Sequence, residues 1–297
     1  MSKTNDPVAL REWIVIAQQD HVRPGQPCRT VVLGQPIECS RGNDGSLLAF
    51  ELEDGCASPG RAIQVRERYG HVWVALSDEP RPMIEIPEFD DPRRRYLGWG
   101  GVMVRTSPQR LVENFLDMGH FAFVHTNLLG SEPHTQVKDY KVELRADVAE
   151  VWATQCVAFQ PKASKAADEG RDVEYTYRTC GPFVVVLYKT AEQPGMFDTM
   201  GMLVQPMGEE HCRVFGYTLL LESETPFVDA LHFQQTIFLQ DRLILEQQTP
   251  ARIPLYDNSE TPARVDAAAI MYRRWLKSQG MRFGIQPPYP APSEETR

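Results

Sequence analysis

Six strand-forming stretches follow one another between residues 137 and 221, and they constrain the fold of this chain more than any other feature. They are rich in Val, Tyr, Phe and Thr, the residues that pack well on a pleated sheet. The stretches are Val137 to Leu144, Val148 to Phe159, Asp172 to Tyr177, Phe183 to Tyr188, Thr199 to Pro206 and Cys212 to Leu221. They predict one large antiparallel sheet.

Three helices are expected around this sheet. Ser107-Pro108 supplies an N-cap and a proline at the first helical position, directly after a short strand over Gly101 to Thr106. Thr225-Pro226 begins a second helix that runs to about Gln248, and Thr261-Pro262 caps a third that reaches Ser278. The fold class is therefore α+β, with helices packed on an antiparallel sheet.

The first 80 residues predict a smaller β structure. Its strands are Arg11 to Gln18, Arg29 to Leu33, Ile37 to Ser40, Leu47 to Leu52 and Val72 to Leu76. Turn signals separate them, among them Arg23-Pro24-Gly25 and Ser58-Pro59-Gly60. A proline-rich connector begins at Glu79. We expect residues 1–85 and 86–297 to form separate domains.

The segment after Ser107-Pro108 brings metal-binding residue types together. It places Asn114, Asp117 and His120 at steps of three residues, the spacing of one helical stripe, and His125 follows. Two imidazoles and a distant carboxylate form the facial triad of non-haem iron(II) oxygenases. On a regular helix His120 and His125 would point about 140° apart. Both reach one metal only if the helix ends, loosens or bulges between them, which Gly119 and the loop-like run Thr126 to Gly130 allow.

A purely structural interpretation of this segment stays open. Two histidines in an aromatic-rich stretch can be core residues with satisfied hydrogen bonds, because short motifs match by chance. The neighbouring Asp117 and Asn114 favour a site, since they put polar groups on a face that packing alone would fill with apolar side chains.

The third ligand of a triad is expected on the long helix near the C-terminus. Asp241 interrupts an apolar run, Ile237-Phe238-Leu239 before it and Leu243-Ile244-Leu245 after it. An acidic group there is costly unless it binds a cation. Glu246 is the alternative on the same helix, and either residue could instead pair with Arg242.

Composition excludes several classes of protein. The 297 residues carry a net charge of −9, whereas nucleic-acid-binding proteins carry basic surfaces. The one cationic cluster, Arg93-Arg94-Arg95, is typical of a solvated loop. The N-terminus lacks an apolar leader, and no stretch approaches the length of a membrane span. The six cysteines include no Cys-x-x-Cys pair and are typical of reduced structural thiols. We therefore expect a cytoplasmic protein.

These residues together resemble the Rieske-type non-haem iron oxygenases, over nearly the whole chain. Asn-x-x-Asp-x-x-His-x4-His is similar to the iron-ligand helix of that family, and residues 66–74 are similar to the strand that closes its Rieske domain. The resemblance implies a helix-grip catalytic domain that follows a truncated Rieske-like domain. It implies that His120, His125 and Asp241 bind one Fe(II). It also implies a catalytic role for Asp117, which would hydrogen-bond a ligand histidine and connect it to a neighbouring cluster.

The chain departs from the family where the Rieske cluster should be. A [2Fe–2S] centre of this type needs Cys-x-His and, later, Cys-x-x-His, and the sequence contains neither. Only 17 residues separate Leu48-Ala49-Phe50 from the Arg68-Tyr69-Gly70-His71-Val72-Trp73 stretch. The loops that hold the cluster are deleted.

Electrons for oxygen activation must then come from elsewhere. The His-x-Asp/Glu pair of 2-oxoglutarate enzymes is absent, as are His-Glu-x-x-His and Gly-x-Gly-x-x-Gly. We expect a separate Rieske-bearing reductase to deliver NAD(P)H electrons for the reaction with O2. The resemblance further suggests a homotrimer or a trimer-based assembly.

His-Phe-Ala-Phe-Val-His narrows the resemblance to the bacterial methylxanthine N-demethylases, which include an N7-specific member without its own cluster. This likeness implies hydroxylation of an N-methyl group on a substrate such as 7-methylxanthine, with release of formaldehyde. Phe238, Leu239 and Gln240 are candidate substrate-binding residues beside the third ligand, or ordinary helix core. Three alternatives stay open: another aromatic or methoxy substrate, a non-catalytic binding module, and a structural subunit of an oxygenase complex.

Overall fold

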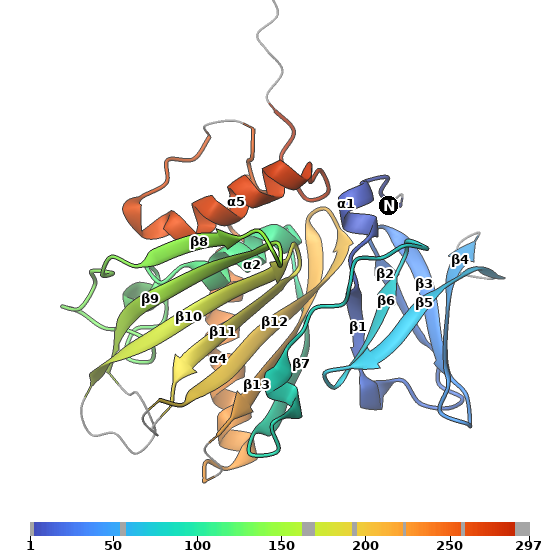
Figure 1. Ribbon diagram of the computed structural model, residues 1–297, viewed down its shortest axis with the longest axis horizontal. Helices are drawn as coiled ribbons and strands as arrows, with labels where there is room; N and C mark the ends of the chain where they lie inside the picture. Colours follow the sequence, from blue (N-terminus) through green and yellow to red (C-terminus); the bar gives the residue numbers. More distant parts are fainter. Residues whose placement is uncertain are drawn as a thin grey trace, which may run out of the picture.

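The computed structural model contains two antiparallel sheets with helices on the larger one (Figure 1). The structure describes residues 3–53, 58–161, 170–191, 195–221, 224–256 and 259–288. Among these residues no helix is both long and apolar enough to cross a membrane.

The smaller sheet has six strands in the order β1-β6-β5-β4-β3-β2. Helix α1 (Pro7–Leu10) precedes it, and a 3-10 turn, η1 (Gln19–His21), follows its first strand. The strands are β1 (Ile14–Gln18), β2 (Cys28–Val32), β3 (Gln35–Arg41), β4 (Leu47–Glu53), β5 (Ser58–Arg68) and β6 (His71–Ala75).

Strand β5 is a correction to the sequence analysis, which expected a turn at Ser58-Pro59-Gly60. The three residues lie at the start of β5, where Ser58 pairs with Glu53 and Pro59 with Leu52 of β4. The strand escaped detection because most of its side chains are exposed and several are charged, so the alternation of apolar and polar residues is weak.

The larger sheet has seven strands in the order β7-β13-β12-β11-β10-β9-β8, and all its pairs are antiparallel. A second 3-10 turn, η2 (Pro87–Asp90), precedes it. Its strands are β7 (Arg95–Val104), β8 (Lys141–Arg145), β9 (Glu150–Gln160), β10 (Arg171–Gly181), β11 (Val184–Thr190), β12 (Phe197–Gly208) and β13 (His211–Leu220). The predicted antiparallel sheet is confirmed.

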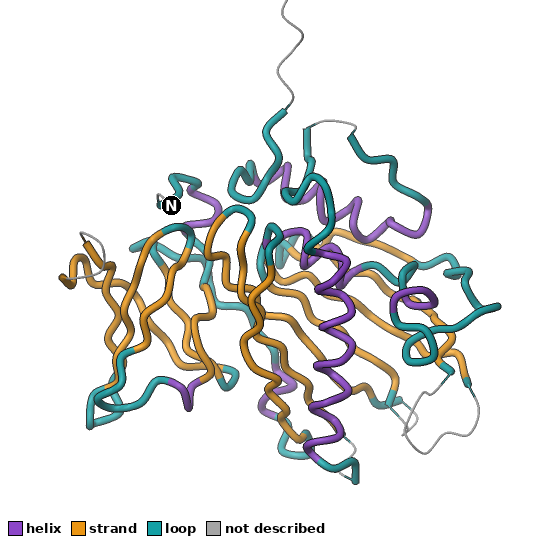
Figure 2. Tube along the Cα trace, turned by 180° about the vertical axis from the view of Figure 1, so that it is seen from behind, coloured by secondary structure: helices purple, strands orange, loops and turns teal. Residues whose placement is uncertain are grey.

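Four helices accompany this sheet. They are α2 (Pro108–Leu116), α3 (Phe121–Val124), α4 (Phe227–Leu245) and α5 (Ala267–Gln279). From behind, α4 is seen to run along one face of the sheet, as in the expected helix-grip fold, while α5 lies at the end of the sheet near β8 and β9 (Figure 2).

The third long helix begins later than its sequence predicts. Thr261-Pro262 does not start it, because Ala263 is extended (φ −91°, ψ 172°), and a short 3-10 turn η3 (Arg264–Asp266) comes before α5. The side chain of Asp266 accepts a hydrogen bond from the Ala263 amide at 2.6 Å, which satisfies a donor at this turn.

The two sheets share contacts and core. The amide of Leu33, at the β2–β3 turn, donates to the Pro206 carbonyl of β12 at 2.7 Å. One cluster of buried apolar side chains contains residues of both sheets. The division into residues 1–85 and 86–297 therefore remains a prediction about folding units.

Five cysteines are free thiols, and Cys56 lies outside the described residues.

Candidate metal centre

The two histidines flank a single helical turn that follows a break in the helix. Helix α2 ends at Leu116, and its C-cap Asp117 is extended (φ −87°, ψ 126°). One further helical turn, α3, has His120 as its N-cap and His125 as its C-cap. The prediction that Asn114, Asp117 and His120 lie on one helical stripe is thus wrong, because α2 ends before Asp117. The break between α2 and α3 lies before His120, and between the two histidines the chain forms one helical turn that ends at His125 (φ −109°, ψ 37°).

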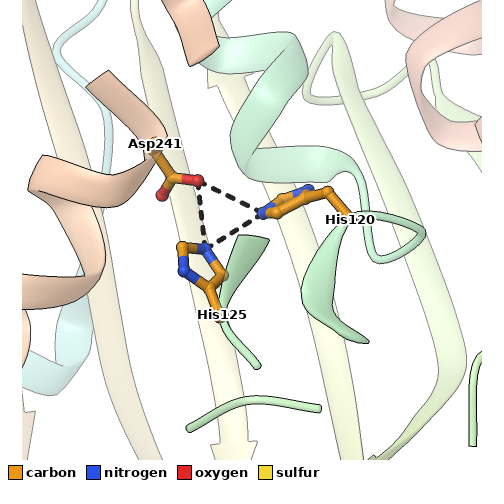
Figure 3. Close-up of side chains that lie close together, drawn as sticks. All are labelled: His120, His125 and Asp241. Atoms are coloured by element: carbon orange, nitrogen blue, oxygen red, sulfur yellow. Dashed lines mark hydrogen bonds and ion pairs between the residues drawn. The ribbon is translucent and has the colours of Figure 1, made fainter. Parts of the chain in front are cut away.

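Three donor atoms converge from two parts of the chain (Figure 3). The Nε2 atoms of His120 and His125 are 3.2 Å apart. Asp241 Oδ1 lies 3.3 Å from the first and 3.0 Å from the second. His125 and Asp241 are buried, with 1% and 5% of their surface exposed. Among the described residues, this is the one group of three His, Cys, Asp or Glu side chains arranged to hold a metal ion.

Neighbouring side chains fix which nitrogen of each ring carries the hydrogen. His120 donates from Nδ1 to Asp117 Oδ2 at 2.9 Å, and His125 donates from Nδ1 to Gln240 Oε1 at 2.8 Å. A neutral imidazole has only one N–H. When both rings are neutral, both Nε2 atoms therefore present lone pairs to Asp241 Oδ1, an atom that carries no hydrogen.

The carboxylates attract positive charge to this point. Burial lowers the pKa of His120, but Asp117 and Asp241 outweigh burial and raise it to about 9. Burial raises the pKa of Asp117 and of Asp241, yet the histidine contacts dominate and hold both carboxyls below their ordinary range. The cation between these groups is either a proton on His120 Nε2 or a metal ion.

The geometry fits a metal ion better than a proton. A proton on His120 Nε2 can form a hydrogen bond to only one neighbouring atom. The lone pairs of His125 Nε2 and Asp241 Oδ1 would then face each other without a hydrogen between them. Three ligands about 2.1 Å from a metal, at right angles to one another, lie about 3.0 Å apart. The observed separations of 3.0, 3.2 and 3.3 Å approach those of a facial triad.

Asp241, not Glu246, faces the histidines. Asp241 lies inside α4, whereas Glu246 follows its last residue and accepts hydrogen bonds from the Arg105 amide and from Arg242 Nε, both at 3.1 Å. The carboxylate of Glu246 is thus engaged elsewhere. Its role as an alternative ligand is not supported.

An apolar cavity adjoins the three donor atoms. It encloses about 650 Å³ that no protein atom fills, including the part open to solvent. Besides the three donors, its lining includes Trp99, Asn114, Phe115, Phe121, Tyr177, Leu187, Met202, Gln234, Ile237 and Phe238. Phe238 thus lies where a substrate-binding residue is expected.

Leu239 and Gln240 do not line the cavity, which corrects their assignment as pocket residues. Leu239 is 48% exposed on the outer side of α4, and Gln240 binds His125. Sequence reasoning missed Gln234, although it precedes Asp241 by seven residues and so shares its helical face. It also missed the sheet residues, since no sequence spacing relates them to the histidines.

A second, outer depression lies on the other side of the same residues. Asp117, Asn114 and His120 line it, together with residues of α5 and of the 254–262 segment. Asp117 also accepts a hydrogen bond from the Gly119 amide at 2.7 Å, and 29% of its side chain is exposed. His120 thus stands between the apolar cavity and an outer depression that contains Asp117.

The smaller sheet carries no cluster site among its described residues. His71 is fully buried and donates from Nδ1 to the Tyr69 carbonyl at 2.7 Å, and Cys28 lies opposite Cys39 across β2 and β3. Strands β4 and β5 pair directly.

Comparison with known proteins identifies the family. Residues 104–280 match the family described as "Vanillate O-demethylase oxygenase C-terminal domain". Over 281 residues, 93% of this chain and 96% of the relative, the sequence is 42% identical to the "Probable methylxanthine N7-demethylase NdmC" of Pseudomonas sp. strain TJI-51. It is 26% identical to "Methylxanthine N3-demethylase NdmB" of Pseudomonas putida over 71% of this chain and 58% of that protein.

A solved structure agrees with the fold. "Pseudomonas putida CBB5 NdmA with caffeine" superposes with a TM-score of 0.74 at 16% identity and covers 90% of both chains. The chain belongs to the Rieske-type non-haem iron oxygenase family, and within it resembles the methylxanthine N-demethylating oxygenases while lacking the sequence motifs of a Rieske cluster.

Proposed function

We propose that this protein is the oxygenase component of a methylxanthine N-demethylase, with His120, His125 and Asp241 as the ligands of one Fe(II). One observation carries the proposal: three donor atoms with unshared lone pairs meet where an apolar cavity ends. The cavity suits a small planar substrate, and a relative 42% identical is described as a methylxanthine N7-demethylase. The substrate class proposed is 7-methylxanthine and similar compounds.

The proposed reaction consumes O2, two electrons and two protons. One oxygen atom enters a C–H bond of the N-methyl group, giving N–CH2OH, and the other leaves as water. The N–CH2OH product then breaks its C–N bond and yields N–H and formaldehyde. Iron(II) held by the three ligands would supply the oxygen activation.

The chain's own residues orient and isolate this chemistry. Asp117 and Gln240 fix both imidazole rings through their Nδ1 atoms, so that each Nε2 is available as a ligand. The aromatic side chains of the cavity, among them Trp99 and Phe238, exclude water and leave room for the flat face of a heterocycle.

A separate Rieske-bearing reductase is the proposed source of NAD(P)H electrons. This sequence has no Cys-x-His or Cys-x-x-His motif, and the outer depression brings solvent to Asp117. Asp117 accepts the hydrogen bond from His120 and so links the outer depression to a proposed ligand. The trimer-based assembly and the cytoplasmic location remain predictions.

Turnover with a supplied reductase tests the proposal. Protein loaded anaerobically with Fe(II) should convert 7-methylxanthine to xanthine with one formaldehyde per product, and a His120→Ala, His125→Ala double variant should form neither. Formaldehyde from a methoxy-benzoate but not from any methylxanthine would instead favour O-demethylation, which the matched family also includes by name. Absence of product from both substrate classes would reject the oxygenase assignment.

A further inference from the structure

Cys28 and Cys39 face each other across a hairpin of the smaller sheet. Strands β2 and β3 are antiparallel, and the two cysteines are directly opposite in the register. The turn between the strands consists of Leu33 and Gly34, both at positive φ (52° and 80°), as in the two-residue type I′ turn of tight hairpins. Residues directly opposite each other project to the same face of a sheet, so the two thiols are neighbours.

The turn also fixes the kind of pair that the cysteines form. A two-residue hairpin begins with a hydrogen-bonded pair, here Val32 and Gln35, and the two kinds of pair then alternate along the strands. Pro36, which has no N–H, thus falls in a non-hydrogen-bonded pair, and Cys28 and Cys39 form a hydrogen-bonded one. The Cα atoms of such a pair are about 5.5 Å apart, within the range that a disulfide spans.

The two thiols differ in access. Cys39 is fully buried, whereas Cys28 is partly exposed. Burial raises the pKa of both thiols, and the neighbouring Cys28 adds to the effect on Cys39, whose pKa is about 12. Arg213 acts on Cys28 in the opposite sense. Cys28 is therefore the thiol that a dissolved reagent can reach first.

Neither sulfur is held by a hydrogen bond within the part of the chain that the structure describes. In contrast, the thiols of Cys180 and Cys212 each donate to a backbone carbonyl, at 3.9 and 3.8 Å. The thiols of Cys28 and Cys39 are thus available to react with each other.

We propose that Cys28 and Cys39 form a reversible disulfide, and that the oxidant is a small soluble disulfide such as oxidised glutathione. The Cys28 thiolate attacks one sulfur of the oxidant, which places a glutathionyl group on Cys28 and releases one glutathione. The Cys39 thiolate then attacks the Cys28 sulfur, closes the protein disulfide and expels the second glutathione. Two protein thiols are oxidised, one oxidant is reduced, and both thiol protons end on glutathione.

Closure should be slow near neutral pH and easily reversed. The raised pKa values keep the thiolate fraction small, so the rate should increase with pH. The Cβ atoms of a disulfide are about 3.8 Å apart, whereas those of opposite residues in a sheet are up to about 5.5 Å apart. The strands must approach each other, and a bond that strains its surroundings is more readily reduced.

The hairpin that carries the two thiols contacts the strand β12, which lines the cavity. Cys28 and Thr30 project to the same face of β2, and Thr30 Oγ1 accepts a hydrogen bond from Gln205 Nε2 of β12 at 2.7 Å. Met200 and Met202 of β12 line the cavity. The proposed disulfide would therefore tie β2 to β3 where the smaller sheet meets the cavity wall. It does not depend on the proposed substrate or on iron.

Peptide mapping after oxidation tests the proposal. Fully reduced protein is incubated with oxidised glutathione at mildly alkaline pH, the remaining thiols are alkylated, and the protein is digested with trypsin without reductant. Cleavage after Arg29 separates Cys28 from Cys39 unless a disulfide joins their peptides. The proteins are wild type, Cys28→Ser, Cys39→Ser and, as the matched control, Cys180→Ser, which removes a buried thiol from the larger sheet.

We expect wild type and Cys180→Ser to lose two thiols and to yield one cross-linked peptide pair that dithiothreitol separates. Cys39→Ser should stop at the glutathione adduct on Cys28, and Cys28→Ser should form neither an adduct at Cys39 nor a disulfide. Unreacted thiols at both positions in folded wild type, an adduct on Cys28 that never closes, or a bond from either residue to a different cysteine would overturn the proposal. The wild-type result is decisive by itself, even if a variant does not fold.

Discussion

At the scale of single residues, the candidate metal centre depends on which ring nitrogen of each histidine carries the hydrogen. Asp117 and Gln240 each accept the Nδ1 hydrogen of one histidine, and this leaves two lone pairs and a carboxylate oxygen directed at one point. The proposed histidine ligands could be identified from residue type and from their spacing to Asp117, and Asp241 from the apolar run that it interrupts. Gln240 could not, because its contact depends on how α4 packs against α3.

Gln240→Met should weaken Fe(II) binding about tenfold to a hundredfold, since partners of this kind typically contribute that much to metal affinity. The reason is that His125 loses the acceptor that orients its ring. Competitive Fe(II) titration against a coloured chelator measures the effect, with Gln235→Met as the control. An unchanged affinity in Gln240→Met would remove Gln240 from the centre.

His71 should make the fold sensitive to mild acid. Burial is the main cause that lowers its pKa from 6.5 to about 4, while the hydrogen bond to the Tyr69 carbonyl and the charge of Asp20 act in the opposite sense. The folded protein thus favours neutral His71, and the stability this contributes is complete above pH 6.5 and is lost as the pH falls toward 4. Between pH 7 and pH 5 the loss is about 2 kcal/mol.

Urea unfolding at the two pH values checks this, with His71→Gln as the variant that cannot titrate. The free energy of unfolding of His71→Gln should fall by about 2 kcal/mol less than that of wild type over this interval. Parallel losses in the two proteins would assign the acid sensitivity to other groups.

At the scale of elements, strands with many apolar side chains were predictable and irregular backbone was not. The strands of the larger sheet agree with their sequence to within a few residues, because β-branched and aromatic residues dominate them. The exposed strand β5, the late start of α5 and the end of α2 at Leu116 depend on tertiary contacts. None of the three was anticipated: the steps between Asn114, Asp117 and His120 predicted a helix that continues to His120, whereas α2 ends at Leu116.

The packing of α4 on the sheet depends on a glycine in β13. A Cβ at Gly216 would lie 1.6 Å from the Trp99 ring, which contacts Phe238 of α4. Gly216→Ala should therefore destabilise the fold by about 1–3 kcal/mol, the usual cost of overpacking. Urea unfolding of Gly216→Ala in wild-type and Trp99→Leu backgrounds measures the coupling. If the alanine costs the same in both backgrounds, the indole is not the obstacle.

At the scale of the whole molecule, His120 separates two environments: an apolar cavity suited to substrate and an outer depression that contains Asp117. The separation is important because this sequence lacks the Cys-x-His and Cys-x-x-His motifs that bind a Rieske cluster. Electrons and substrate can approach the centre from different sides.

Asp117→Asn should abolish turnover driven by the reductase while turnover driven by hydrogen peroxide persists. Peroxide carries the oxygen atom together with both electrons, so it needs no partner protein. Formaldehyde release under the two conditions, with iron content determined in parallel, distinguishes the outcomes. Equal loss under both conditions would mean that Asp117 acts on the metal and not on electron delivery.

The most direct test of the account is the stoichiometry of Fe(II) binding under anaerobic conditions. The arrangement of His120, His125 and Asp241 predicts one Fe(II) per chain in wild type, and binding weakened at least a hundredfold in His125→Ala, since one of three protein ligands is lost. Undiminished Fe(II) binding in His125→Ala, or none in wild type, would contradict it.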